Sequence, residues 1–156
     1  MRKATIDEIP FDFNRRRLSI VVKHAGDTSL ERLLITKGGP EGILALCISY
    51  DAAGKKQEFN AEALALCNKT YQDFCKQGLR VLAVAYRQVL QHDGFSIEDE
   101  HSLTLAGFLV FADPPTPDAG TSLAALHRDG VQVKILTGDN ELVARHICAE
   151  VGWKIQ

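Results

Sequence analysis

Residues 113–117 read Asp-Pro-Pro-Thr-Pro, and this stretch limits the possible folds of the chain more than any other. Proline lacks a backbone N–H and fixes φ, so three prolines within five residues exclude a helix interior or a central β-strand. Such a stiff stretch is typical of a hinge or a domain boundary. We therefore expect one domain in residues 1–112, a hinge in residues 113–117 that includes Asp113, Pro114 and Pro115, and a second segment in residues 118–156.

The first segment has the pattern of a mixed α/β domain. Runs typical of strands lie at residues 20–23, 30–36, 79–86 and 103–111, and the turn-rich residues 24–29 join the first two runs into a predicted hairpin. Residues 91–101 are polar and predict a loop. A short helix is expected from Pro40, and a longer one from Asn60 to Gly78. These elements predict a largely antiparallel sheet flanked by helices.

The second segment predicts a piece of an open α/β sheet. Its expected elements are a helix from Asp118 to Gly130, a strand at residues 131–136, a tight loop at residues 137–140 and a helix from Glu141 to Gly152. This α-β-α order is typical of Rossmann-like folds, which include the haloacid dehalogenase fold.

Composition excludes several classes of protein. The formal net charge is −2, so no global field attracts nucleic acid, and any anion site must be local. No apolar run approaches the roughly 20 residues of a membrane helix, and the N-terminus lacks the apolar region of a signal peptide. The four cysteines form no CxxC pair, which indicates reduced thiols, and the five histidines lack metal-ligand spacing. Walker A, GxGxxG and Ser-His-Asp patterns are absent as well.

Three short constellations combine residue types that suit a nucleotide. Phe11 and the arginines at 15–17 offer a stacking face beside positive charge, but taken alone such residues are more often core rings and a solvated charge run. Lys37-Gly38-Gly39-Pro40-Glu41 follows a strand, where a lysine can reach a cleft, but it also suits an ordinary turn into a helix. Thr137-Gly138-Asp139-Asn140 follows a predicted strand and offers a hydroxyl, an amide and a carboxylate to phosphate and Mg²⁺.

The order of these motifs resembles the cytoplasmic nucleotide-binding domain of P-type cation-transporting ATPases, continuing into part of the phosphorylation domain. IPFDFNRRRLSIVV resembles the adenine-site strand of the family, KGGPE its KGAPE motif with Gly39 in place of Ala, and GLRVLAVA the strand with a phosphate-binding arginine. DPPT resembles the DPPR or DPPK hinge, with Thr116 at the basic position, and VKILTGDN resembles the TGD motif. The resemblance covers nearly the whole chain, and it is greatest for the bacterial magnesium-transporting subgroup.

The resemblance implies a role for each motif. Counted back from Ser19, Phe11 rather than Phe13 takes the adenine-stacking place, and Arg16 takes the place of a basic residue near the nucleotide. Lys37 and Gly38 would line the adenine pocket, Arg80 would meet the phosphates, and Thr137, Gly138 and Asp139 would hold the phosphoryl group and Mg²⁺. The implied ligands are therefore ATP and the Mg²⁺ that accompanies it.

The chain lacks the DKTGT loop that carries the phosphorylated aspartate in this family, as well as the GDGxND and TGES motifs. We therefore expect a soluble part of a longer membrane protein of the bacterial inner or plasma membrane, which binds ATP and works with phosphorylation, actuator and membrane domains elsewhere in the polypeptide. Enzymatic activity is expected of the full-length protein, and nucleotide binding alone of this chain. The incomplete sheet after the hinge would allow self-association. The alternatives are a non-catalytic regulatory or partner-binding module of the same fold and a fragment of a haloacid-dehalogenase-like phosphatase.

Overall fold

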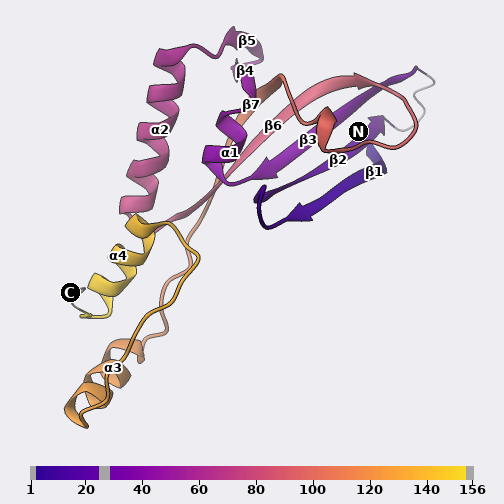
Figure 1. Ribbon diagram of the computed structural model, residues 1–156. Helices are drawn as coiled ribbons and strands as arrows, with labels where there is room; N and C mark the ends of the chain where they lie inside the picture. The colour runs from indigo at the N-terminus through magenta and orange to yellow at the C-terminus, as the bar shows by residue number, and fades with distance from the viewer. Residues whose placement is uncertain (1–2, 25–28, 154–156) are drawn as a thin grey trace. The chain divides into compact units, whose positions relative to one another are not determined.

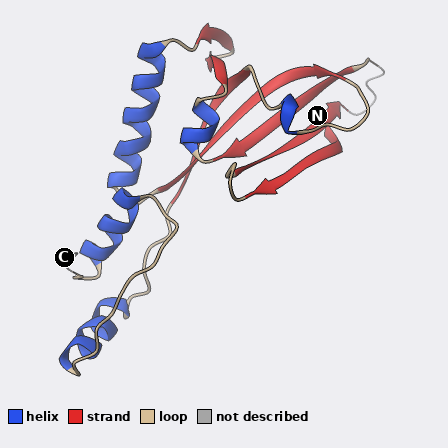
Figure 2. Ribbon diagram, viewed as in Figure 1, coloured by secondary structure: helices blue, strands red, loops and turns tan. Residues whose placement is uncertain are grey.

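The computed structural model describes residues 3–24 and 29–153 and contains one sheet and several helices (Figures 1 and 2). The strands are β1 (Lys3–Asp12), β2 (Arg17–His24), β3 (Glu31–Gly38), β4 (Cys47–Ala52), β5 (Lys55–Glu58), β6 (Arg80–Leu90) and β7 (Leu103–Phe111). The helices are α1 (Pro40–Leu44), α2 (Ala61–Lys76), α3 (Ala119–Arg128) and α4 (Glu141–Glu150), with a 3₁₀ turn, η1 (Ile97–Asp99), between β6 and β7.

The sheet is largely antiparallel, as predicted. Its strand order is β1-β2-β3-β6-β7-β4-β5. The β1–β2, β2–β3, β3–β6 and β4–β5 pairs are antiparallel, whereas β4 pairs with β7 in parallel. The predicted strands at residues 20–23, 30–36, 79–86 and 103–111 are all present, and the predicted link at residues 24–29 lies mostly at 25–28, outside the described residues.

Compact packing divides the chain into two units. The first comprises residues 1–67 and 82–109, and the second comprises residues 68–81 and 110–156. Their sequence limits differ from the predicted domains because the second half of α2 packs with residues 110–156. The proposed domain limits at 112 and 118 remain a prediction.

The core of the first unit lies on one face of the sheet. Ser19, Thr36 and Ala85 lie directly opposite one another on β2, β3 and β6, and all three are buried. Because side chains alternate between the two faces of a strand, the same register buries a contiguous apolar set. This set is Ile9, Val21, Leu34, Ile43, Leu44, Cys47, Ala83, Ala85, Val89, Phe95, Leu103 and Leu105.

The loop at residues 91–102 crosses the buried face of the sheet and ties several strands together. Asp7 Oδ2 on β1 accepts a hydrogen bond from the backbone N–H of Phe95 at 3.0 Å. Arg87 Nη1 donates to the backbone oxygens of Asp99 and His101, at 3.4 and 3.2 Å. Ser96 and Asp99 form a capping box at η1. The predicted loop is therefore ordered and covers the core.

The second unit is organised around the carboxyl-terminal part of α2. The side-chain amide of Asn140 donates to Tyr71 Oη at 2.9 Å, and its Oδ1 caps α4 through the N–H of Leu142. His146 Nδ1 lies 2.9 Å from the carbonyl oxygen of Lys76, at the end of α2. Both contacts dock α4 against α2. No helix in the described chain has the length and apolar character that a membrane span requires.

The predicted strand at residues 131–136 is absent, and this prediction is wrong for the structure. These residues are all described and belong to no strand, and the sheet contains no segment that follows residue 111. A strand needs a hydrogen-bonded neighbour, because an isolated extended segment has no partner for its backbone N–H and C=O groups. Val131, Ile135 and Leu136 accordingly remain 46%, 46% and 95% exposed.

We expect fast hydrogen exchange at residues 132–136 and slow exchange at residues 81–85. Within the described chain, the N–H groups of 132–136 donate no backbone hydrogen bond, whereas residues 83–85 belong to the β3–β6 ladder. Unbonded amides exchange without local unfolding. Amide exchange followed by NMR would measure this difference. Equal protection of the two segments in a monomer would contradict it.

Candidate nucleotide site

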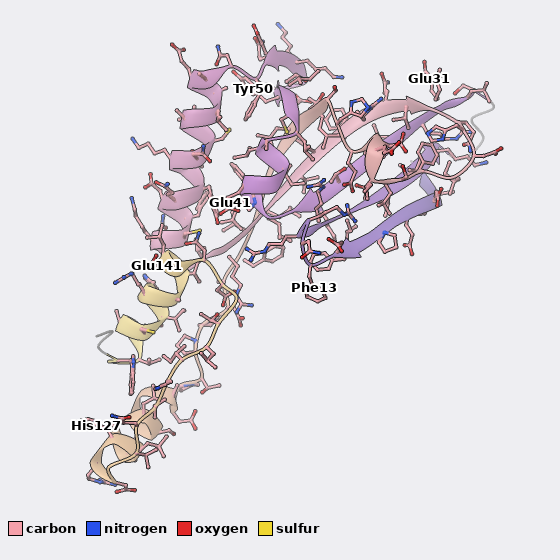
Figure 3. All side chains as sticks on the ribbon, viewed as in Figure 1. Phe13, Glu31, Glu41, Tyr50, His127 and Glu141 are labelled. Atoms are coloured by element: carbon pink, nitrogen blue, oxygen red, sulfur yellow. The ribbon has the colours of Figure 1, made fainter. Side chains whose placement is uncertain are left out.

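An aromatic pair lies at the end of β1 and in the turn that follows, with Phe11 on the strand and Phe13 in the turn. Phe11 is 50% exposed and Phe13 is 86% exposed, and their ring centroids lie 5.2 Å apart with an interplanar angle of 87°. Figure 3 shows Phe13 pointing away from the sheet. Neither ring belongs to the core, so the alternative that these phenylalanines are core residues is wrong. The spacing from Ser19 selects Phe11 rather than Phe13 for adenine stacking, and this choice stays a prediction.

The run of three arginines is not a uniform solvated charge. Arg15 Nη1 and Arg17 Nε donate to Glu100 Oε2 at 2.6 and 2.7 Å, and their side chains are only 18% and 17% exposed. Arg15 Nη2 also donates to the backbone oxygen of Pro10 at 2.9 Å. Arg16 is exposed, and its side chain makes no hydrogen bond or ion pair with the described residues. Arg16 is therefore the arginine of this run that is available to a ligand.

The backbone of the turn is fixed at both ends. Asp12 Oδ1 accepts hydrogen bonds from the N–H groups of Asn14 and Arg15. The backbone carbonyl oxygen of Asp12 accepts a further hydrogen bond from the Arg16 N–H at 2.7 Å. Arg16 has φ +49°, a left-handed conformation that is uncommon for a residue with a side chain. Its carbonyl oxygen accepts a hydrogen bond from the Gly39 N–H at 3.0 Å. The turn is thereby held against the end of β3.

Gly38 permits this close approach. A Cβ atom at Gly38 would lie 2.4 Å from the Arg16 oxygen and 2.5 Å from the Arg17 Cβ. Gly38 also lies directly opposite Arg17 in the β2–β3 register. A glycine is therefore required where the KGGPE segment passes the turn. The structure gives Gly38 this steric role, and its place in an adenine pocket remains a proposal.

Lys37 lies on the face of the sheet opposite to the core. Its neighbours directly across the ladders are Leu18 on β2 and Val84 on β6, and both are partly exposed. Lys37 itself is exposed and forms no ion pair or hydrogen bond with the described residues. A free ammonium group beside a shallow apolar surface suits a ligand that has both a flat ring and negative charge. Sequence reasoning did not identify Leu18 and Val84, because their proximity to Lys37 depends on strand register.

Glu100 organises the buried side of this region. Its side chain is fully buried, and Oε1 accepts a hydrogen bond from Ser19 Oγ at 2.7 Å. Ser19 Oγ lies 2.8 Å from Thr36 Oγ1, the residue before Lys37. Burial raises the pKa of Glu100, but hydrogen bonds from Arg17, Ser19 and Arg15 together lower it by more, so the net pKa lies below the ordinary value of 4.5. The carboxylate is therefore ionised at neutral pH.

The second unit gathers the other predicted site residues. Arg80 Nη1 lies 2.9 Å from Asp113 Oδ2, and Arg80 Nη2 donates to Asp139 Oδ2 at 3.0 Å. Thr137 Oγ1 donates to the same Asp139 oxygen at 3.1 Å and accepts from the Asp139 N–H at 3.1 Å. Thr137, Gly138 and Asp139 are exposed, and a Cβ atom at Gly138 would meet nothing within 4 Å. Arg80 thus links Asp113, in the Asp-Pro-Pro-Thr-Pro stretch, to Asp139 in the Thr137-Gly138-Asp139 loop.

A cavity of about 350 Å³ lies beside this ion-pair cluster. Its polar lining includes Arg80, Asp113, Thr137 and Asp139, and its apolar lining includes the hinge residues Pro114 and Pro115. The structure therefore brings Arg80, Asp113, Thr137 and Asp139 together in one unit. Phe11, Arg16, Lys37 and Gly38 belong to the other unit.

Comparison with known proteins covers nearly the whole chain. Residues 1–118 match the family described as P-type ATPase, cytoplasmic domain N. The magnesium-transporting ATPase, P-type 1, of Salmonella typhimurium (strain LT2) is 41% identical over 152 residues, which cover 97% of this chain and 16% of that protein. The Escherichia coli (strain K12) protein of the same name is 40% identical over 152 residues, covering 97% of this chain and 17% of that protein.

A calcium-transporting ATPase of Listeria monocytogenes is 30% identical over 146 residues, which cover 93% of this chain and 16% of that protein. This chain therefore spans about one sixth of the length of the relatives that it matches. The matched residues include the KGGPE segment, the arginine turn and the hinge. The chain belongs to the P-type cation ATPase family and contains the cytoplasmic domain N of that family.

Proposed function

We propose that this chain binds ATP and presents its phosphate end for transfer to an aspartate of a P-type ATPase that transports magnesium. The observation that carries the proposal is the arrangement at the β1–β2 turn and the end of β3. An exposed aromatic pair, a free Arg16 and a free Lys37 are held together there by the contact between Arg16 and Gly39. This combination of a flat apolar surface with positive charge fits adenine and phosphate.

Phe11 and Phe13 would provide the stacking surface for adenine. Phe11 is included by its spacing from Ser19, and Phe13 by its greater exposure and its edge contact with Phe11. Lys37, with Leu18 and Val84 beside it, would bound the base on the open face of the sheet, and Gly38 would allow the backbone to remain close to the turn. Arg16 would face the negative charge of the nucleotide.

The second unit has groups of its own that suit phosphate and Mg²⁺. The hydroxyl of Thr137, the amide of Gly138 and the carboxylate of Asp139 form a donor set that fits a phosphoryl group together with Mg²⁺. Bound Mg²⁺ would neutralise negative charge on the phosphate oxygens. Arg80 is engaged by Asp113 and Asp139, so binding of a phosphate by its guanidinium would exchange carboxylate partners for phosphate oxygens. Acceleration in such a system comes from positioning and charge neutralisation.

The identities support magnesium as the transported ion. The magnesium-transporting relatives are 40–41% identical to this chain, and the calcium-transporting relative is 30% identical. Ion selectivity itself would depend on residues of the parent protein that bind the ion. Transport assays on the full-length protein with Mg²⁺ and Ca²⁺ would test this part of the proposal, which fails if Ca²⁺ alone is transported.

We expect titration with ATP to shift the amide signals of residues 11–18 and 37–39, with a Kd of about 0.1 mM to several mM. One aromatic platform and a few exposed charges give weak binding. Replacing Phe11 or Phe13 by Ala should weaken binding about fivefold or more, because base stacking is lost. Lys37→Ala should weaken it about two- to fivefold, as expected for an exposed charge.

The matched control is Lys55→Ala, because Lys55 is an exposed lysine of the same unit, on β5. This substitution removes the same charge and should leave the Kd unchanged. Loss of affinity to the same extent in both lysine variants would show that Lys37 contributes only general charge. Absence of any ATP-dependent shift in the unmodified chain would overturn the proposed site.

A further inference from the structure

Glu100 is the one acidic side chain among the described residues that is fully buried and bound by two arginines. It lies in the loop between β6 and β7, more than 80 residues from the arginines in the sequence. Burial of a carboxylate is unfavourable unless it is paired and hydrogen-bonded. The network satisfies this requirement, and no buried side-chain N or O atom of the described chain lacks a partner. The question is what this arrangement does for the exposed surface next to it.

One oxygen of Glu100 fixes the turn between β1 and β2. Oε2 accepts from Arg15 and Arg17, the two residues on either side of Arg16. With both neighbours anchored inward, the Arg16 side chain remains outside, and the Arg16 backbone is held at φ +49°. The carbonyl oxygen of Arg16 then meets the Gly39 N–H. The contacts to this single carboxylate oxygen therefore fix the backbone conformation of the turn that carries Phe13 and Arg16.

The other oxygen of Glu100 fixes the strand that carries Lys37. Oε1 accepts from Ser19 Oγ, which is hydrogen-bonded to Thr36 Oγ1 across β2 and β3. Ser19 and Thr36 are both fully buried. Thr36 directly precedes Lys37, whose side chain lies on the opposite face of the sheet. The two oxygens thus join the two exposed groups of the proposed nucleotide site through the interior.

We propose that Glu100 is a positioning residue for nucleotide binding, which holds the Phe13–Arg16 turn and the Lys37 strand in the geometry that ATP requires. This inference rests on the proposed function. Since neither Glu100 nor Ser19 is accessible to solvent, neither can touch the ligand, and any effect of changing them on affinity must be transmitted through position. The gain is preorganisation, because a turn that is already ordered loses less entropy on binding.

Glu100→Gln is the main test, in the full chain. The variant keeps the size of the side chain, but it removes the negative charge that pairs with two guanidinium groups, and it replaces one of the two acceptor oxygens by an NH₂ group that can only donate. We expect the Kd for ATP to rise about tenfold, a coupling typical of residues that share one network. Hydrogen exchange at the Gly39 N–H should become faster, while exchange at Val21 in the core should change only as far as global stability does. If Glu100 only stabilised the fold, the exchange rate at Gly39 would not change separately from the exchange rate at Val21.

Two companion variants keep the proposal falsifiable. Glu98→Gln removes the same charge from an exposed residue of the same loop and should leave the Kd and Gly39 exchange unchanged. Ser19→Ala retains both arginine contacts, so it should fold even if Glu100→Gln does not, and it should raise the Kd about threefold. If the unmodified chain binds ATP and the folded Glu100→Gln or Ser19→Ala variant binds it equally well, the inference is wrong. If the unmodified chain does not bind ATP, the proposed function itself fails.

Discussion

Replacing Gly38 by Ala is expected to lower the free energy of unfolding by about 3 kcal/mol and to weaken ATP binding strongly. The added methyl group would lie 2.4 Å from the Arg16 oxygen, 2.5 Å from the Arg17 Cβ and 2.8 Å from the Arg17 Cα. Two of these atoms belong to the backbone of the neighbouring strand and turn, so no rotamer change can make room. Overpacking of this kind costs roughly 1–3 kcal/mol or more. Urea unfolding monitored by circular dichroism would measure the loss.

Gly39→Ala is the matched control for this substitution. A Cβ atom at Gly39 would meet its nearest neighbour, Glu41 Oε2, at 3.6 Å, which is an ordinary contact. The backbone there has φ −56° and ψ 133°, which alanine adopts without strain. Replacing this glycine should therefore be neutral, or stabilising by about 0.4–1 kcal/mol, because it reduces the entropy of the unfolded chain. If Gly38→Ala were as stable as Gly39→Ala, the close contact between the turn and β3 would be wrong.

The regular elements with a strong apolar period could be predicted from the sequence. The β2–β3 hairpin, α2, β6 and β7 have such a pattern, and Pro40 marked the first turn of α1. β1 and the β4–β5 hairpin were not predicted. β1 contains Asp7, Glu8 and Pro10 and lies at one edge of the sheet, and β5 reads Lys-Lys-Gln-Glu, fully exposed at the other edge. Edge strands pair on one side only, so polar and charged residues are tolerated there and weaken the signal.

The candidate site residues Phe11, Arg16, Lys37 and Gly38 could be named from short motifs and from their resemblance to the family, and their roles stay predictions. The role of Glu100 is not local, because its partners lie 81 to 85 residues away in the sequence. Nothing in the polar stretch at 91–101 marks this glutamate as buried. The same limit applies to Arg15 and Arg17. In the sequence they are two of three consecutive arginines, and only the fold shows that Glu100 binds these two and not Arg16.

The strand predicted at residues 131–136 shows a different limit. The alternation of Val131, Val133 and Ile135 with polar residues is a genuine strand pattern. A pattern predicts which conformation a segment prefers when partners are present, but β-structure is completed by hydrogen bonds to a neighbour. The described chain has no strand beside these residues. The helices on either side, α3 and α4, form nearly where they were predicted, because helical hydrogen bonds are internal to the segment.

Gly78→Ala is expected to destabilise the second unit by about 2–4 kcal/mol. Gly78 ends α2 with φ +76°, a left-handed conformation that is unfavourable for alanine by roughly 1–2 kcal/mol. A Cβ atom there would also lie 2.4 Å from Cδ2 and 3.0 Å from Cγ of His146 on α4. Displacing this ring would break its contact with the Lys76 oxygen, which docks α4 on α2. The chain has one tryptophan, Trp153, which belongs to the same unit as α4 and follows its C-cap residue Val151 by two positions, so its fluorescence during urea unfolding reports on this unit.

Gly130→Ala separates the two causes of that loss. Gly130 follows α3 as Gly78 follows α2, with φ +80° and a backbone hydrogen bond to the third residue before it, but a Cβ atom there would meet nothing within 4 Å. This variant should show the conformational strain alone, about 1–2 kcal/mol. In the Gly78→Ala/His146→Ala double variant the clash is relieved, so the combined loss should be smaller than the sum of the single losses by about 1 kcal/mol or more. Strict additivity of Gly78→Ala and His146→Ala, or equal losses in the Gly78 and Gly130 variants, would show that α4 does not pack against the end of α2 through His146.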